Sequence, residues 1–386
     1  MLNRRILRSK AMQSLYAYYK SEEANYNLAL DFISEKFLPD LNSMEPGDKS
    51  ELSLKKKESR KIFQSNFRQD SFSNIKDGEQ DTELTALDAF EEYSNHNKED
   101  YLHFKNAMIR DVDHIFDLYL WLLILPSELA YHSDNDRKEK DGDIPNHFVN
   151  NLVVQLLRED LIFNTELNRR KISWGNFNNE VHNWYKNVLK KSTEFQDYLN
   201  EPKENWQNID TDRKLILLLY KSLLFKNESF QIFMESEDLN WEENKHVLKS
   251  MVLKTFKNVT GDDSNIQLSV LSNNWEDDKT FFEKLFQITI QKGKEFDNLI
   301  AEKSKNWDIE RIAIMDKIIL KMAIAEMIHF PSIPVKVTIN EYIELSKNFS
   351  TPKSKKFVNG ILDVLSEELK ELGIIKKSGR GLIDNK

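Results

Sequence analysis

Residues 307–369 decide the expected fold and read WDIERIAIMDKIILKMAIAEMIHFPSIPVKVTINEYIELSKNFSTPKSKKFVNGILDVLSEEL. Apolar residues recur every three or four positions over 312–328, which predicts an amphipathic helix. Pro334 prevents that helix from continuing. Thr338-x-x-Glu341 has the spacing of a capping box, which predicts that a second helix begins there.

A third helix is predicted immediately after the second. Thr351 has the chemistry of an N-cap, and Pro352 suits the first helical position. Gly360 is expected to let two helices approach closely, because it has no Cβ. Three consecutive helices without an alternating strand pattern predict an all-α fold built from helical bundles and hairpins.

The composition agrees with this fold class and excludes several kinds of site. The 386 residues are too many for one compact helical unit, and Gly (10) and Pro (8) are scarce, which favours long helices. The absence of cysteine excludes disulfides, thiolate catalysis and iron–sulfur clusters. Because the net charge is −9, any contact with nucleic acid has to be a local basic patch.

Neither a signal peptide nor a membrane span is predicted, and a cytoplasmic location is expected. Residues 1–20 lack the apolar core and cleavage site of a secretory signal. The most apolar run, 118–125, is far shorter than the roughly 20 residues that cross a bilayer.

Patterning divides the chain into four regions. Residues 1–41 form an arginine-rich helical region, and 42–100 are so charged that a partly disordered insertion is expected. Residues 101–170 form additional helices, with a polar loop at 131–146, and 171–386 form the main helical domain. Within that domain a phenylalanine precedes a tryptophan by 11 residues three times, at 195–206, 230–241 and 296–307, which predicts stacked helical hairpins with aromatic cores.

The sequence contains no catalytic signature. None of the eight histidines forms an H-x-x-x-H or H-E-x-x-H pair, and no P-loop, G-x-G-x-x-G or G-x-S-x-G occurs. We therefore expect no enzyme activity, no metal and no cofactor.

Two basic clusters indicate nucleic-acid binding. Arg4, Arg5 and Arg8 lie within one arc of a helix start, in a segment 1–20 that has no acidic residue. Cations at a helix N-terminus oppose the macrodipole, so a purely structural helix would prefer acids there. This unfavourable choice favours a phosphate-binding role.

The second cluster comprises Lys353, Lys355 and Lys356, followed directly by Phe357. An aromatic ring beside cations at a helix start can stack on a base while the cations neutralise phosphates. The alternative is that Phe357 belongs to the apolar core with its neighbours Val358 and Ile361.

The stretch 307–369 resembles the C-terminal half of NusB transcription antitermination factors. Four linked motifs carry the resemblance: RIA-x-x-D-[RK]-x-[IL]-L at 311–320, A-x-x-E-M at 323–327, I-P-x-K-V-x-I-N-E-x-[IV]-E-L at 333–345, and K-F-V-N-G-[IV]-L-D at 356–363. The N-terminal R-R-x-x-R…Q-x-L-Y pattern, which includes Gln13, is similar to the family's arginine-rich first helix.

The resemblance implies two helical bundles in which both basic clusters form one surface that binds boxA-like RNA of ribosomal RNA leaders. It implies NusE, a small-subunit ribosomal protein, as the partner, and RNA polymerase as an indirect one. The RNA contacts that the resemblance implies are Arg4, Arg5, Arg8, Gln13 and Phe357. The second basic cluster adds Lys353, Lys355 and Lys356 as expected RNA contacts. The implied partner contacts are Asp316, Lys317, Lys321 and Glu326.

The chain departs from the family pattern at Ser350, where glycine is frequent, and at Lys353, where an acid is common. The lysine should strengthen attraction to phosphate, so we expect RNA binding that depends less on the partner.

Two other functions remain open. One is a helical scaffold that binds only proteins. The other is an accessory module of RNA modification, because some RNA methyltransferases carry a NusB-like domain beside a catalytic domain whose cysteine and glycine loop are missing here.

Overall fold

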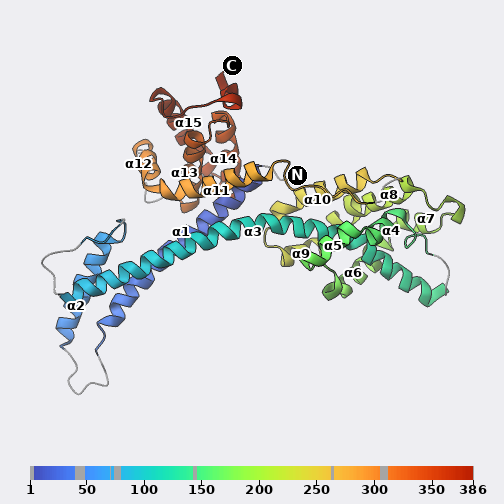
Figure 1. Cartoon of the computed structure of the whole chain (residues 1–386), viewed down its shortest axis with the longest axis horizontal. Helices are drawn as coiled ribbons and strands as arrows, with labels where there is room; N and C mark the ends of the chain where they lie inside the picture. Colours follow the sequence, from blue (N-terminus) through green and yellow to red (C-terminus); the bar gives the residue numbers. More distant parts are fainter. Residues whose placement is uncertain are drawn as a thin grey trace. The chain divides into compact units, whose positions relative to one another are not determined.

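The computed structural model describes residues 4–39, 48–69, 71–73, 80–141, 146–261, 265–304 and 312–385. Every regular element in these ranges is helical, which confirms the predicted all-α fold (Figure 1). The chain forms two compact units. Unit 1 comprises Met1–Leu7 and Arg110–Asp278, and unit 2 comprises Arg8–Ile109 and Lys279–Lys386.

The longest helices are α1 (Arg4–Lys36) and α3 (Gln80–Asp141). Unit 1 also contains α4 (Leu152–Glu159), α5 (Leu161–Arg170), α6 (Asn178–Trp184), α7 (Thr193–Leu199), α8 (Ile209–Leu218), α9 (Glu228–Glu237) and α10 (Trp241–Asn258). Short 3-10 or π turns link these helices: η1 (Gly175–Phe177), η2 (Tyr185–Leu189), η3 (Lys203–Asn205), η4 (Leu219–Leu223) and η5 (Leu224–Lys226).

Unit 2 contains most of α1, then α2 (Lys49–Asn66) and the first part of α3. After α11 (Trp275–Gln291) it continues with α12 (Gly293–Lys303), α13 (Ile314–His329), α14 (Val335–Phe349), α15 (Ser354–Glu371) and η7 (Gly379–Asn385). The domain boundary predicted at residue 171 does not coincide with this division, because residues 171–278 pack with the second part of α3. No helix in the described part of the chain is both long and apolar enough to cross a bilayer.

Stacked aromatic rings fill the interior of unit 1. Trp121 and Trp174 lie face to face with ring centroids 4.0 Å apart, and each indole donates to a backbone carbonyl, of Ser173 and Trp121 respectively. The repeat phenylalanines Phe195 and Phe230 are fully buried, which confirms their predicted core role. The third repeat's Trp307 lies outside the described residues.

Two helix boundaries differ from the sequence prediction. Helix α3 continues through Pro126 to Asp141, so residues 131–141 are helical and not loop. The helix expected over 149–167 is divided at Asp160, whose carboxylate caps α5 by accepting from the amides of Ile162 and Phe163. Its second oxygen accepts from the Ile266 amide at 2.6 Å, which a continuous helix would not permit.

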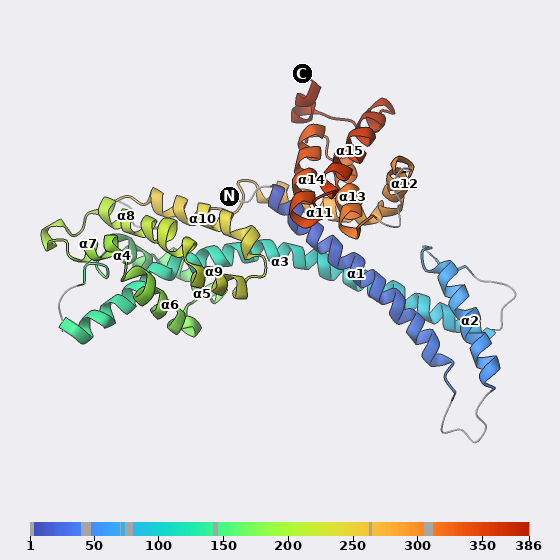
Figure 2. The same cartoon turned by 180° about the vertical axis from the view of Figure 1, so that it is seen from behind.

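Residues 42–100 contain a packed bundle where a partly disordered insertion was predicted. The described part forms α2 and the start of α3, which pack with the second half of α1 (Figures 1 and 2). We call this three-helix group the insertion bundle. Its core comprises Ala29, Ile33, Phe37, Ile62, Phe63, Ala86, Ala89, Phe90 and Tyr93. The prediction is wrong for these residues because a few apolar side chains, spread among many charges, meet across three helices.

Helix α13 is the central helix of the C-terminal part of unit 2. Every residue from 318 to 327 is buried, so the helix is enclosed on all sides. Helix α14 begins directly after Pro334, one turn before the predicted capping box, and the Thr338 hydroxyl donates to Glu326 of α13. Helix α15 begins at Ser354 with Lys353 as its N-cap residue, which corrects the assignment of that role to Thr351.

Removing the Phe63 side chain tests whether the insertion bundle is folded. Phe63 is fully buried and packs edge to face on Tyr93, so Phe63→Ala should destabilise the bundle by about 3–5 kcal/mol. Hydrogen exchange of the amides of residues 49–66 should accelerate strongly. Exposed Ser53→Ala is the control, and unchanged protection in Phe63→Ala would contradict the packed bundle.

Gly360 offers a second test, because the structure corrects its predicted role. It is exposed on α15, and a Cβ built there meets no atom within 4 Å, so no close helix approach requires glycine. Gly360→Ala should therefore raise the free energy of unfolding by about 0.5–1 kcal/mol through helix propensity. Urea denaturation measures this change, and a loss of stability would show that the backbone there needs glycine.

Candidate nucleic-acid and partner interface

A buried ion pair joins the first helix of unit 2 to its central helix. Arg8 of α1 has 3% of its surface exposed and Glu326 of α13 has none. The Arg8 Nε and Nη2 atoms donate to the two carboxylate oxygens of Glu326, each at 2.7 Å. This two-pronged geometry is the strongest form of a charge-assisted hydrogen bond.

Neighbouring side chains complete the coordination of Glu326. The hydroxyls of Thr338 and Tyr342 on α14 donate to it at 2.8 and 3.1 Å, so the carboxylate receives four hydrogen bonds from two helices. Burial acts to lower the pKa of Arg8, but the Glu326 carboxylate outweighs it and raises that pKa above its ordinary value. Because its charge is fully compensated inside the protein, we assign Arg8 a structural role.

A second buried contact fixes the start of α15. Ser354 donates through its hydroxyl to Asp316 on the first turn of α13 at 2.7 Å. The hydroxyls of Ser350 and Thr351 lie 2.9 and 2.8 Å from the same Ser354 oxygen. This hydroxyl cluster holds the opening turn of α15 against α13.

The three lysines of that turn face solvent. Lys353, Lys355 and Lys356 are exposed, and none makes an ion pair with any residue that the structure describes. Phe357, in contrast, is only 8% exposed and lies in the same buried face of α15 as Val358 and Ile361. The predicted stacking of a base on Phe357 is therefore corrected: its ring belongs to the core.

Comparison with known proteins identifies this part of the chain. The NusB family model matches residues 244–367, which include most of α10, all of α11 to α14 and most of α15. The chain carries a NusB family domain. The resemblance expected from the sequence is thereby confirmed.

Curated relatives match the same part of the chain. The transcription antitermination protein NusB of Chloroherpeton thalassium is 48% identical over 106 residues, which is 28% of this chain and 50% of that protein. The NusB of Salinibacter ruber is 43% identical over 105 residues, 27% of this chain and 66% of that protein. This chain thus spans about half to just under two thirds of these relatives.

A solved structure, T. maritima NusB, is 26% identical and the alignment covers 40% of this chain and 90% of that one. Its TM-score is 0.23, below the level at which two folds count as alike.

The remaining predicted RNA contacts lie outside the matched NusB residues. Arg4 is partly exposed and pairs with Asp278 of unit 1 at 3.1 Å, while Arg5 is exposed and Gln13 half-buried. Arg8 is corrected from an RNA contact to a positioning residue, since its guanidinium is enclosed. Arg4 and Arg5 belong to unit 1 and the lysines of the NusB domain to unit 2, so their predicted common surface remains a prediction.

Within unit 2, the two fixed helix starts are anchored at different positions on α13. Arg8 is bound at Glu326 and Ser354 at Asp316, ten residues earlier. At 1.5 Å per residue, these anchors are about 15 Å apart along the helix. The first turns of α1 and α15 therefore both contact α13, but at two separate positions along it.

The predicted partner contacts of the NusB domain are mostly interior. Asp316, Lys321 and Glu326 are buried, and Lys321 pairs with Asp297 at 2.8 Å. Their prediction as surface contacts is corrected, because each is committed to a partner inside unit 2. Lys317 alone of the four is half-exposed and without an ion pair among the described residues, so it stays a candidate.

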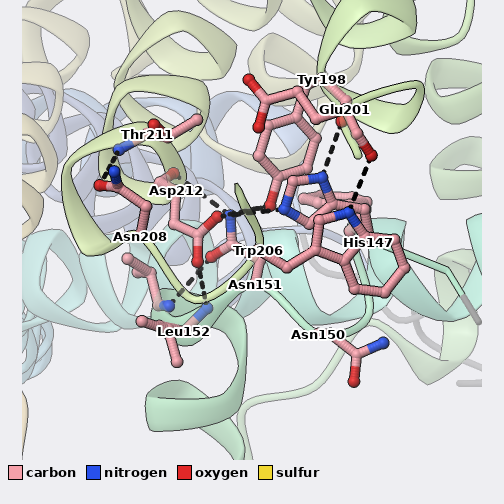
Figure 3. Close-up of polar contacts among 12 residues, drawn as sticks. His147, Asn150, Asn151, Leu152, Tyr198, Glu201, Trp206, Asn208, Thr211 and Asp212 are labelled. Carbon is pink, nitrogen blue, oxygen red and sulfur yellow. Dashed lines mark hydrogen bonds and ion pairs between the residues drawn. The ribbon is translucent and has the colours of Figure 1, made fainter. Parts of the chain in front are cut away.

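Another polar cluster lies in unit 1 and was not predicted (Figure 3). His147 is stacked between Tyr198 and Trp206, with ring centroids 3.9 and 4.7 Å away. Asp212 accepts from the Tyr198 hydroxyl at 2.6 Å and from the Leu152 amide at 2.8 Å. Burial raises the pKa of Asp212, and its hydrogen bonds act in the opposite direction.

This cluster joins α4, α7 and α8 and is closed to solvent, since His147 and Asp212 each expose 1% of their side chains. The same figure shows Asn151, which caps α4 and also contacts Tyr198 and Asp212. We assign this whole polar cluster to the core of unit 1. No group of three or more metal-ligating side chains occurs in the described residues.

Replacing Arg8 tests the assigned structural role. Arg8→Ala leaves the Glu326 carboxylate buried without its cation, which should lower the free energy of unfolding by about 3–5 kcal/mol. Glu326→Gln should also destabilise, and the double variant should cost less than the sum because the two residues form one unit. Urea denaturation followed by circular dichroism measures all three.

The matched control is Lys20→Ala on the same helix, whose ion pair with Glu23 is exposed and should matter little. An Arg8→Ala variant as stable as Lys20→Ala would contradict the structural assignment.

Proposed function

We propose that this chain is an RNA-binding transcription antitermination factor that works without catalysis or a cofactor. It binds boxA-like elements of ribosomal RNA leader transcripts in the cytoplasm, together with the small-subunit ribosomal protein NusE. The NusB domain supports this class of function, because the relatives that match it bear the name transcription antitermination protein.

The observation that carries the proposal is the lysine triplet at the start of α15, which makes no ion pair within the described parts of the chain. Lys353, Lys355 and Lys356 lie on the outside of the NusB domain, on a turn that the Ser354–Asp316 contact fixes to α13. Three cations without acidic partners at a positive helix end favour an anionic ligand. In a chain of net charge −9, such a local patch is where phosphate is best accommodated.

The proposed RNA surface therefore centres on the lysine triplet, with Arg4, Arg5 and Gln13 as further candidates. Arg8 contributes indirectly by fixing α1 to α13, and Phe357 by anchoring α15 in the core. Lys317 is the candidate for contact with the ribosomal protein. The buried Asp316, Lys321 and Glu326 support the backbone that presents these side chains.

Charge reversal of the triplet tests the proposal. Lys355→Glu/Lys356→Glu should weaken binding of a labelled ribosomal RNA leader by about tenfold or more, because two phosphate contacts are lost. The slope of log K against log salt should fall by about 1.4, at roughly 0.7 per phosphate for a single strand. Fluorescence anisotropy at several salt concentrations gives both values, with and without NusE.

Lys370→Glu at the other end of α15 is the matched control, since that lysine is equally exposed. Lys353→Asp should weaken binding most when NusE is absent. If the wild-type chain shows no salt-dependent RNA binding in either condition, a protein-only scaffold replaces this proposal.

A further inference from the structure

Unit 2 contains a cleft of about 1160 Å³ that the lysine triplet does not line. Its walls come from the middle of α1, the end of α2, α12 and the start of α13. The NusB domain supplies α12 and α13, whereas α1 and α2 lie outside the matched residues 244–367. The insertion bundle thus adds a wall that the NusB domain alone does not supply.

Aromatic rings form the wall contributed by the insertion bundle. Tyr26 and Phe67 line the cleft and are half-buried, with ring centroids 4.7 Å apart and planes inclined by 51°. Tyr93 supports Phe67 edge to face at 6.1 Å, and Gln64 donates to the Tyr26 hydroxyl at 3.1 Å. These contacts hold both rings in place. The Arg68 guanidinium lies over the Phe67 ring, with its Cζ atom 5.1 Å from the centroid, so the half-buried Tyr26 ring is the one that suits stacking on a planar ligand.

The acidic residues of the cleft are largely neutralised by the protein itself. Asp297 pairs with Lys321 at 2.8 Å, and Glu23 pairs with Lys20 at 2.8 Å. Glu22 accepts a long hydrogen bond from the Tyr93 hydroxyl at 3.4 Å, and burial raises its pKa. Of the three acids, only Glu22 is left without a cationic partner at ion-pair distance.

Three cations of the cleft have no acidic partner at ion-pair distance among the described residues, although Arg68 and Lys294 act electrostatically on Glu22 and oppose the rise in its pKa. Arg68, Lys294 and Lys317 make no ion pair with any described residue, and the first two are exposed. Lys294 on α12 donates to the backbone carbonyl of Arg68, so two cationic residues from facing walls lie next to each other. An accessible aromatic ring beside cations that outnumber the acids left without an ion pair is typical of single-stranded nucleic-acid sites.

We propose that this cleft is a second RNA site, which takes a nucleotide of a single strand with its base against Tyr26, beside the Phe67–Arg68 pair, and its phosphate near Arg68, Lys294 and Lys317. The site rests on the proposed RNA binding and extends it to a surface built jointly by the insertion bundle and the NusB domain. Stacking is tolerant of base identity, so this site should hold RNA flanking a specific element.

Arg68→Glu/Lys294→Glu in the full-length chain tests the charge contribution. With a labelled 20-nucleotide oligouridylate, affinity should fall about tenfold or more, and the salt slope should fall by about 1.4. The matched control is Lys57→Glu/Lys98→Glu, which reverses two exposed charges of the insertion bundle outside the cleft. An equal loss of affinity in both variants would overturn the site, because it would show that RNA binding depends only on the overall charge of the protein.

Tyr26→Ala tests the stacking contribution separately. It should weaken oligouridylate binding severalfold with little change in the salt slope, since no charge is lost. RNA carrying 4-thiouridine should cross-link to peptides that contain Tyr26 or Phe67. Cross-links confined to α15 would overturn the site.

Two further measurements separate this inference from its alternatives. If uridine monophosphate at millimolar concentration displaces the oligonucleotide, the cleft is a mononucleotide site and not an RNA site. If Arg68→Glu/Lys294→Glu loses NusE but keeps RNA, the cleft is a protein site. Testing Lys355→Glu/Lys356→Glu in parallel keeps the two proposals distinguishable, because each variant alters only one surface.

Discussion

The ion pair between Arg8 and Glu326 is the contact on which the arrangement of unit 2 depends. It lies in the interior, where an unpaired charge is costly, so α1 cannot leave α13 without exposing or stranding both groups. Thr338 and Tyr342 extend the same contact to α14. One carboxylate therefore fixes α1, which is distant in sequence, against the consecutive helices α13 and α14.

This contact changes the role assigned to the arginine-rich first helix. An arginine that opposes the helix dipole suggested a ligand outside the protein, but Arg8 finds its anion inside. The lysines that we propose as RNA contacts lie on the opening turn of α15, whose position the Ser354–Asp316 contact fixes. The buried contacts of α13, at Asp316 and Glu326, orient the neighbouring helices, whereas the exposed lysines of α15 can contact a ligand.

Sequence reasoning recovered the all-α fold, the family resemblance of 307–369 and the aromatic core of the hairpins, because each rests on local periodicity or on linked motifs. It failed where long-range packing decides. The insertion bundle draws its core from three helices, and no single window of its sequence is apolar enough to predict it. Glu326 offered a usable signal, since it is the one acid of a mostly apolar helix segment, 318–327, and a buried carboxylate requires a cation or hydrogen-bond donors. The aromatic cleft offered none, because its walls are distant in sequence.

The stacked pair of Trp121 and Trp174 has a practical consequence for spectroscopy. Six of the seven tryptophans belong to unit 1, and only Trp307 falls within unit 2. Indole emission, and any exciton coupling from the stacked rings, will therefore report chiefly on unit 1. Comparing the loss of that signal with the loss of helical circular dichroism, to which both units contribute, would show whether unit 1 melts before the rest of the chain.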